Sequence, residues 1–221
     1  MSPRWIAIAV ALLLTACSST GRNFQRPSVN LLTLGQTTVA DAIAAFGEPT
    51  ERHVDPGDAE TPTYFDRVKP RPAALRRAKV QGDIEHLRYT YTHATMTMLS
   101  DQAVARIRLL ELAFWKDRLI YYHFSSSFPE DSTDFDDARA VSLVKGRTNR
   151  TDVLNLFGPP GGEGIYPQVA RRGTRLYLYQ YAIVGPEPGQ LTLKRLELLF
   201  NAAERLEEIY LTSEKRGRDD P

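Results

Sequence analysis

The 221-residue chain carries 28 basic and 27 acidic side chains, four histidines and one cysteine. This balance of charge excludes the strongly basic composition of a general nucleic-acid-binding protein, and a single cysteine excludes an intramolecular disulfide. With 42% hydrophobic residues the chain can bury two small cores, and its stability must come from them.

The first 17 residues have the pattern of a bacterial lipoprotein signal. Arg4 gives a basic start, residues 5–14 are apolar, and Leu14-Thr15-Ala16-Cys17 is a small-residue cleavage site that ends in the cysteine. Ten helical residues span about 15 Å, about half of the hydrocarbon core of a membrane, so this segment is a poor transmembrane helix. An ordinary secretory signal with an incidental cysteine is the alternative.

By resemblance to bacterial lipoproteins, residues 1–16 would be removed and Cys17 would receive acyl chains such as palmitate. Three such chains would anchor the protein firmly to a membrane. Serines follow Cys17 instead of an aspartate, which in lipoproteins points to the outer membrane. We therefore expect a body in the periplasm, joined to the outer membrane by a lipid-anchored tether over residues 17–27.

Residues 35–49 and 146–160 share one pattern at a constant offset of 111 residues. Each reads Gly-x-Thr, three residues, Asp, four residues, Phe-Gly-x-Pro, and six of fifteen positions are identical where ordinary residue frequencies would give about one. The chain is therefore an internal duplication. The identical positions are Gly35, Thr37, Asp41, Phe46, Gly47 and Pro49 in the first copy and Gly146, Thr148, Asp152, Phe157, Gly158 and Pro160 in the second.

Each copy of the pattern predicts a short helix. Thr37 or Thr38 can cap the first helix, with Asp41 in a capping-box position, and Asn149 with Asp152 repeats that spacing. Apolar residues three apart follow, and the Phe-Gly-x-Pro end of each pattern stops the helix. A phosphate-binding role for the glycines is disfavoured, because the glycine-rich strand-to-helix turn of such sites is missing.

Segments rich in aromatic and branched residues follow each helix. They predict strands at 84–95, 104–115 and 118–126, and again at 175–184, 191–200 and 205–212. The expected fold class is α+β, with two tandem modules that each pack a short helical segment on a three-stranded antiparallel meander. The modules would span 28–128 and 140–213, separated by an acidic linker over 129–139 and followed by a polar tail over 214–221.

A long insertion over residues 53–81 interrupts the first module. It contains four prolines and a basic run that includes Arg71, Arg76 and Arg77. We predict that these arginines contact anionic lipid headgroups or an acidic partner. The alternatives are a solvated mobile loop and a short helix over 73–80.

Two further segments differ between the copies. Residues 129–137 hold five acids but lack the central glycine and the distal glutamate of a calcium loop, so we interpret them as a hydrated linker without a metal. The glycine-rich residues 161–173 are interpreted as a flexible loop, with Tyr166 and Pro167 available for contacts.

The titratable residues show no catalytic or metal-binding motif. His53, His86, His93 and His123 form no His-x-Glu or His-Glu-x-x-His arrangement, and we interpret them as polar strand residues that do not gather in one site. We therefore expect no enzymatic activity, no cofactor and no bound metal.

Eight of the ten tyrosines fall in predicted strands. Alternation along a strand places Tyr89 with Tyr91 on one face, and likewise Tyr177, Tyr179 and Tyr181. If a row faces outward, it is a candidate protein-binding platform, because tyrosine offers a large contact area with few rotatable bonds. The alternative is that these rings line the cores under the helices.

The cleavage site, the twin Gly-x-Thr…Phe-Gly-x-Pro segments and the strands after each resemble the SmpA/OmlA (BamE-like) outer-membrane lipoprotein superfamily. The tandem arrangement also resembles the β-lactamase inhibitor protein, although the assembly factors of the superfamily have one module instead of two. The resemblance implies a non-catalytic, protein-binding role in the envelope, as a scaffold or assembly-accessory factor. An inhibitor or sensor of a soluble periplasmic enzyme, peptide or glycan is the alternative.

Overall fold

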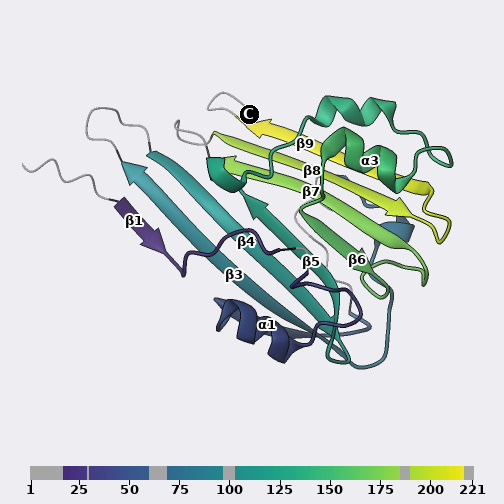
Figure 1. Cartoon of the computed structure of the whole chain (residues 1–221), viewed down its shortest axis with the longest axis horizontal. Coiled ribbons are helices and arrows are strands. Elements are labelled where there is room, and N and C mark those ends of the chain that lie inside the picture. Colours follow the sequence, from purple (N-terminus) through teal and green to yellow (C-terminus); the bar gives the residue numbers. More distant parts are fainter. Residues whose placement is uncertain (1–16, 29, 60–68, 97–102, 185–189, 217–221) are drawn as a thin grey trace, which may run out of the picture.

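The computed structural model describes residues 17–28, 30–59, 69–96, 103–184 and 190–216. Within these ranges, nine strands form one antiparallel sheet, eight of them in the order β1-β3-β4-β5-β6-β7-β8-β9 (Figure 1). The ninth, β2, pairs with β3 along the same edge as β1 but at the other end of β3. The strands are β1 (Cys17–Thr20), β2 (Glu51–Pro56), β3 (Asp83–Met96), β4 (Ala103–Trp115), β5 (Arg118–Ser126), β6 (Gly162–Ile165), β7 (Arg175–Val184), β8 (Leu191–Phe200) and β9 (Leu206–Arg216).

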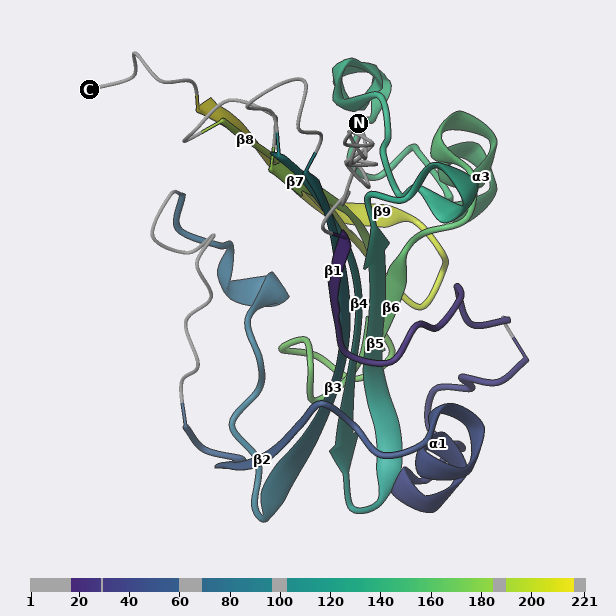
Figure 2. The ribbon, with the colours of Figure 1, turned by 90° about the vertical axis from the view of Figure 1, so that its left-hand side faces the viewer.

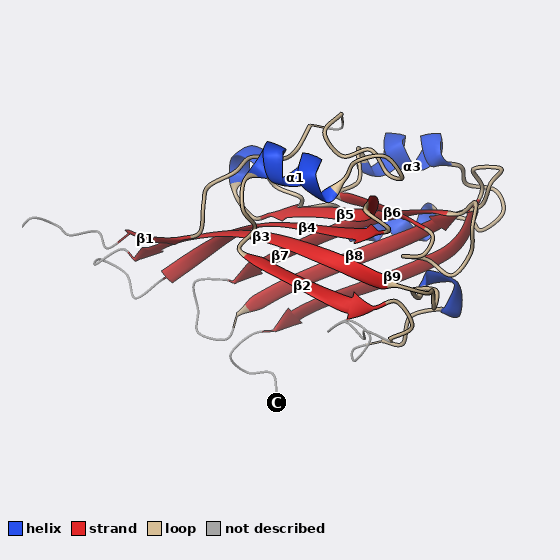
Figure 3. Ribbon diagram, turned by 90° about the horizontal axis from the view of Figure 1, so that it is seen from below, coloured by secondary structure: helices blue, strands red, loops and turns tan. Residues whose placement is uncertain are grey.

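Two α-helices, α1 (Val39–Phe46) and α3 (Arg150–Phe157), lie on the same face of the sheet (Figures 2 and 3). Three short 3-10 helices complete the described elements: η1 (Ala73–Leu75), η2 (Pro129–Asp131) and η3 (Asp137–Ser142). Figure 2 shows that η1, coloured blue, lies on the opposite side of the sheet from α1 and α3. None of the helices in the described ranges has the length and apolar character needed to cross a membrane.

The expected α+β fold class with two helix-on-meander modules is wrong. The described chain is mostly β, because the strands of both sequence copies belong to one sheet. Strand β6 joins them: Gly162 pairs with His123 of β5 on one side and with Leu178 of β7 on the other. Beyond β6, Ala105 of β4 pairs directly with Val184 of β7. The positions of the six expected strands are confirmed, but β1, β2 and β6 were not expected.

The flexible loop expected at the start of 161–173 is strand β6 at that point. Its glycines permit close pairing, because a Cβ on Gly162 would lie 2.4 Å from the carbonyl oxygen of Tyr122 and one on Gly161 would lie 2.6 Å from that of Phe124. Any larger residue would push β6 away from β5. A run that reads as flexible in sequence is therefore closely paired in the sheet.

The Gly-x-Thr pairs tie the start of each helix to the last strand of its half. Gly35 N–H donates to the Leu119 carbonyl at 2.7 Å, and Leu119 N–H donates to the Thr37 carbonyl at 2.9 Å. The second copy repeats these two hydrogen bonds at the same two distances, from Gly146 N–H to the Leu206 carbonyl and from Leu206 N–H to the Thr148 carbonyl. The glycines have φ values of 76° and 77°, a region that favours glycine, which explains their identity in both copies.

The predicted helix ends are confirmed. Thr38, not Thr37, caps α1 and forms a capping box with Asp41, and Asn149 with Asp152 does the same for α3. The hydroxyl of Thr37 instead accepts a hydrogen bond from Thr33 N–H at 2.9 Å. Each helix ends at a glycine, with φ 81° and 75°.

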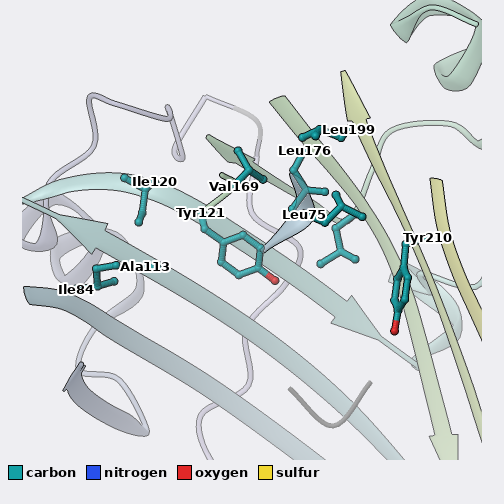
Figure 4. Close-up of a cluster of buried hydrophobic side chains, with 10 residues drawn as sticks. Leu75, Ile84, Ala113, Ile120, Tyr121, Val169, Leu176, Leu199 and Tyr210 are labelled. Carbon is teal, nitrogen blue, oxygen red and sulfur yellow. The ribbon is translucent and has the colours of Figure 1, made fainter. Parts of the chain in front are cut away.

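Each α-helix covers its own core, and a third core lies on the opposite face. The core under α1 includes Leu87, Tyr89 and Phe114, and the core under α3 includes Val153 and Tyr179. The third, here called the shared core, contains residues from both halves of the chain (Figure 4). Its buried members are Leu75, Ile84, Ala113, Ile120, Tyr121, Val169, Leu176, Leu178, Leu199 and Tyr210.

Candidate functional site

The sheet face opposite α1 and α3 carries several charged side chains and histidines. Residues 69–81, which include η1, cover the part of this face that carries the shared core. The part formed by β2, β3 and β4 carries a band of polar side chains, here called the open stripe. The open stripe consists of Glu51, His53, Asp55, His86, Arg88 and Glu111.

Residues 69–81 are attached to the sheet, so this part of the insertion is not a solvated loop. Leu75 is fully buried in the shared core. Ala78 N–H donates to the Pro167 carbonyl at 2.8 Å, and the Tyr210 hydroxyl donates to the Lys69 carbonyl at 2.6 Å. A 3-10 turn at Ala73–Leu75 replaces the short helix considered for 73–80. Residues 60–68 of the insertion lie outside the described ranges.

A buried ionic network fastens the insertion to β8. Arg71 donates two hydrogen bonds, of 2.7 and 3.0 Å, to one carboxylate oxygen of Glu197. Arg195 donates to the other carboxylate oxygen at 2.5 Å and also to the side chain of Gln180. Glu197 is fully buried and Arg71 is 8% exposed. Arg71 is therefore occupied by its own chain and is not placed to reach a lipid headgroup.

Arg76 and Arg77, the other predicted contact residues, also bind their own chain. Arg76 donates to the Arg71 carbonyl at 3.1 Å. Arg77 donates to the Ala59 carbonyl at 2.6 Å, and its guanidinium lies 3.6 Å from the Asp55 carboxylate. The three arginines thus hold the insertion in place, a role that the sequence pattern did not indicate.

Charged groups of the open stripe form a chain across three strands. Arg88 on β3 binds Glu111 on β4 at 2.9 Å and Glu51 on β2 at 3.0 Å. Glu111 also lies 3.5 Å from Nδ1 of His123, which is fully buried. Burial opposes ionisation of Glu111, but hydrogen bonds from His123 and Arg88 lower its pKa to about 2. Burial lowers the pKa of His123, and the neighbouring Glu111 opposes that shift.

Two histidines meet at the edge of the open stripe. His53 and His86 are register partners on β2 and β3, and their rings stack with centroids 4.6 Å apart and planes 4° apart. Nε2 of His86 lies 3.3 Å from the Asp55 carboxylate. Burial, followed by the neighbouring His53, lowers the pKa of His86 to about 4. The expectation that the histidines do not gather is wrong for this pair, because β2 was not foreseen.

The predicted tyrosine platform faces the helices. Tyr89, Tyr177 and Tyr179 are at most 5% exposed, so the alternative that these rings line the cores is confirmed for them. Tyr91 stacks on Phe128 with ring centroids 5.6 Å apart, and Tyr181 is half-buried beside Lys194. The tyrosine row therefore offers little free surface.

The acidic segment between the two halves packs against the sheet. Glu130 and Asp131 bind Arg108 at 2.5 and 2.8 Å, and the Arg108 side chain is only 3% exposed. Asp134 binds Lys194 at 2.8 Å. Phe135 is buried in the core under α3. These acids serve as ion-pair partners of the fold.

The chain matches no protein-family model, no curated protein and no solved structure. The open stripe is partly accessible: the side chains of Glu51, His53 and Arg88 are between 42% and 51% exposed. These groups project from paired strands and not from loops. Such an arrangement suits recognition of a polar protein surface or the holding of a cation.

Proposed function

We propose that this protein is a non-catalytic outer-membrane lipoprotein that faces the periplasm and binds other envelope proteins as a scaffold or assembly-accessory factor. The proposal rests on the position of the signal pattern relative to the sheet. The cleavage pattern ends at Cys17, and Cys17 is the register partner of Thr95 in the pairing of β1 with β3. The first four residues of the tether expected over 17–27 therefore lie in β1.

Attachment at Cys17 would leave the open stripe at a distance along the sheet from the lipid anchor. Arg88 and Ile84, the latter paired with Asp55, lie seven and eleven residues along β3 from Thr95. At about 3.3 Å per residue, the stripe begins roughly 23 Å and ends roughly 36 Å from the anchor along the strands. That distance is suited to contact with the periplasmic part of a membrane protein or with a soluble partner.

The composition of the stripe supports a protein partner. Acidic Glu51 and Glu111 alternate with basic Arg88, so the stripe has no single sign of charge that would favour a nucleic acid or an anionic lipid surface. Partly exposed arginine and histidine on rigid strands are suited to polar pairing across an interface.

Mild crosslinking in native envelopes tests the proposal. The tagged wild-type protein, the Cys17→Ala variant and the Arg88→Glu variant are crosslinked, and captured proteins are identified by mass spectrometry. We expect outer-membrane assembly components with wild type, loss of capture and release from the membrane fraction with Cys17→Ala, and weaker capture with Arg88→Glu. Arg139→Glu, an exposed arginine near α3, is the matched control and is expected to behave as wild type.

Two results would count against this function. Capture of one soluble periplasmic protein by both the wild type and Cys17→Ala would favour the inhibitor or sensor function instead. Equal capture by Arg88→Glu and wild type would remove the open stripe as the contact surface.

A further inference from the structure

Three potential metal ligands meet at the β2 edge of the sheet. One ligand atom from each of His53, Asp55 and His86 lies within 4.8 Å of the other two. His53 and Asp55 are two residues apart on β2, so their side chains share a face, and His86 is the register partner of His53 on β3. All three residues therefore project from hydrogen-bonded backbone.

The spacing at His86 and Asp55 matches that of two ligands of one ion. Ligands about 2.0 to 2.1 Å from a tetrahedral zinc ion lie about 3.3 Å apart. Nε2 of His86 and the nearest carboxylate oxygen of Asp55 are 3.3 Å apart. Nε2 of His86 is buried and makes no hydrogen bond of good geometry to any other described residue. The lone pair of His86 Nε2 therefore lies at ligand spacing from the Asp55 carboxylate but accepts no hydrogen bond from the described residues.

His53 supplies the third ligand after a change of its ring angle. A metal bound by an imidazole lies in the plane of the ring, and the stacked rings of His53 and His86 are nearly parallel. The His53 side chain is 42% exposed, so its ring can turn toward the ion without disturbing a core. Its exposure also leaves a fourth coordination position open to water.

We propose that His53, Asp55 and His86 bind a divalent transition-metal ion, for which zinc is the best match. Two imidazoles and one carboxylate are a ligand set suited to zinc. The same set also binds copper or nickel, so it discriminates only weakly among these ions. The three ligands belong to the open stripe, but the proposed metal site does not rest on the proposed partner-binding function.

The charges around the site set its strength. Arg77 lies 3.6 Å from the Asp55 carboxylate and competes with the ion for it. Glu51 lies 3.9 Å from Nδ1 of His53 and adds negative charge on the other side. Arg77→Gln is therefore expected to tighten binding, which is a result that a merely structural cluster would not give.

Zinc titration by calorimetry tests the site. The full chain with Cys17→Ala, in mild detergent and without a polyhistidine tag, is titrated at about pH 7. We expect one bound ion per chain. His53→Ala, His86→Ala and Asp55→Asn are each expected to raise the dissociation constant for zinc at least about tenfold. Loss of a residue that only supports a ligand already lowers metal affinity by about that factor. His93→Ala, on β3 outside the cluster, is the matched control and is expected to bind as wild type.

A second measurement separates loss of a ligand from loss of the fold. Cobalt replaces zinc, and its visible absorption is recorded beside a thermal melt of each variant. A ligand-field band that disappears in His53→Ala while the melt is unchanged supports the proposal, since His53 is exposed. The proposal is overturned by the absence of saturable zinc binding, or by binding that survives in both His53→Ala and His86→Ala.

Discussion

The hydroxyl of Tyr179 donates a hydrogen bond of 2.8 Å to the carbonyl oxygen of Gly158, the C-cap residue of α3. Tyr89 makes the same bond, at 3.1 Å, to Gly47 at the end of α1. Each tyrosine thus fixes the end of a helix to a strand beneath it. The duplicated Phe-Gly-x-Pro segment and a tyrosine far from it in the sequence form one structural unit.

Tyr179→Phe is expected to lower the free energy of unfolding by about 1 to 2 kcal/mol, because the ring stays and the Gly158 carbonyl loses its partner. Urea denaturation measures the change. Tyr181→Phe, a half-buried tyrosine on the same strand and face, is the matched control, with an expected change of no more than about 0.5 kcal/mol. Equal losses in the two variants would show that the hydrogen bond to Gly158 is not what matters.

Glu197→Gln is expected to destabilise the protein by about 3 to 5 kcal/mol, because Arg71 and Arg195 would stay buried without their counter-charge. Glu208→Gln breaks the exposed pair with Lys145 and is expected to cost less than about 1 kcal/mol. Denaturation midpoints of both variants provide the comparison. The expectation fails if Glu197→Gln is no worse than Glu208→Gln.

Stability is expected to fall in mild acid through His86. Burial, with His53 as the second cause, lowers its pKa from 6.5 to about 4, so the folded protein binds fewer protons at this site than the unfolded chain does between those values. The stability is complete above about pH 6.5 and is lost as the pH falls toward 4, by at most about 3 kcal/mol.

Urea denaturation from pH 7 to 4 in the presence of a chelator measures this dependence. His86→Gln is expected to flatten the curve over that window. The same slope in wild type and variant would assign the acid sensitivity to other groups, among them His123.

Gly162→Ala is expected to be more harmful than Gly146→Ala. A Cβ at Gly162 would meet the Tyr122 carbonyl, and β6 would have to move away from β5. Gly146 has open space around it, so an alanine at this position would cost only the strain of the positive φ, about 1 to 2 kcal/mol. Thermal melts of the two variants test the order, and a reversed order would show that the β5–β6 contact adapts easily.

Local patterns were predictable from the sequence and long-range contacts were not. The capping boxes at Thr38 and Asn149 depend on residues three apart, and the six long strands depend on composition within ten residues or so. Strand β6 has four residues, two of them glycine, and only its two neighbours make it a strand.

The candidate site shows the same division. The basic run in the insertion was visible, but the partner of Arg71 is 126 residues away at Glu197, and no local signal indicates that pairing. His53 and His86 approach each other only because β2 pairs with β3. The sequence correctly predicted that Tyr89 and Tyr179 lie in strands. Only the structure shows that they point to the sheet face that the helices cover.

The shared core draws Leu75 and Ile84 from the first half of the chain and Leu178 and Tyr210 from the second, each at most 1% exposed. Neither half can bury this apolar surface alone. The whole sheet is therefore expected to melt in one cooperative transition, and a chain cut within 129–139 to yield fragments that fold only together. The two similar segments thus belong to one sheet whose shared core takes side chains from both halves of the chain.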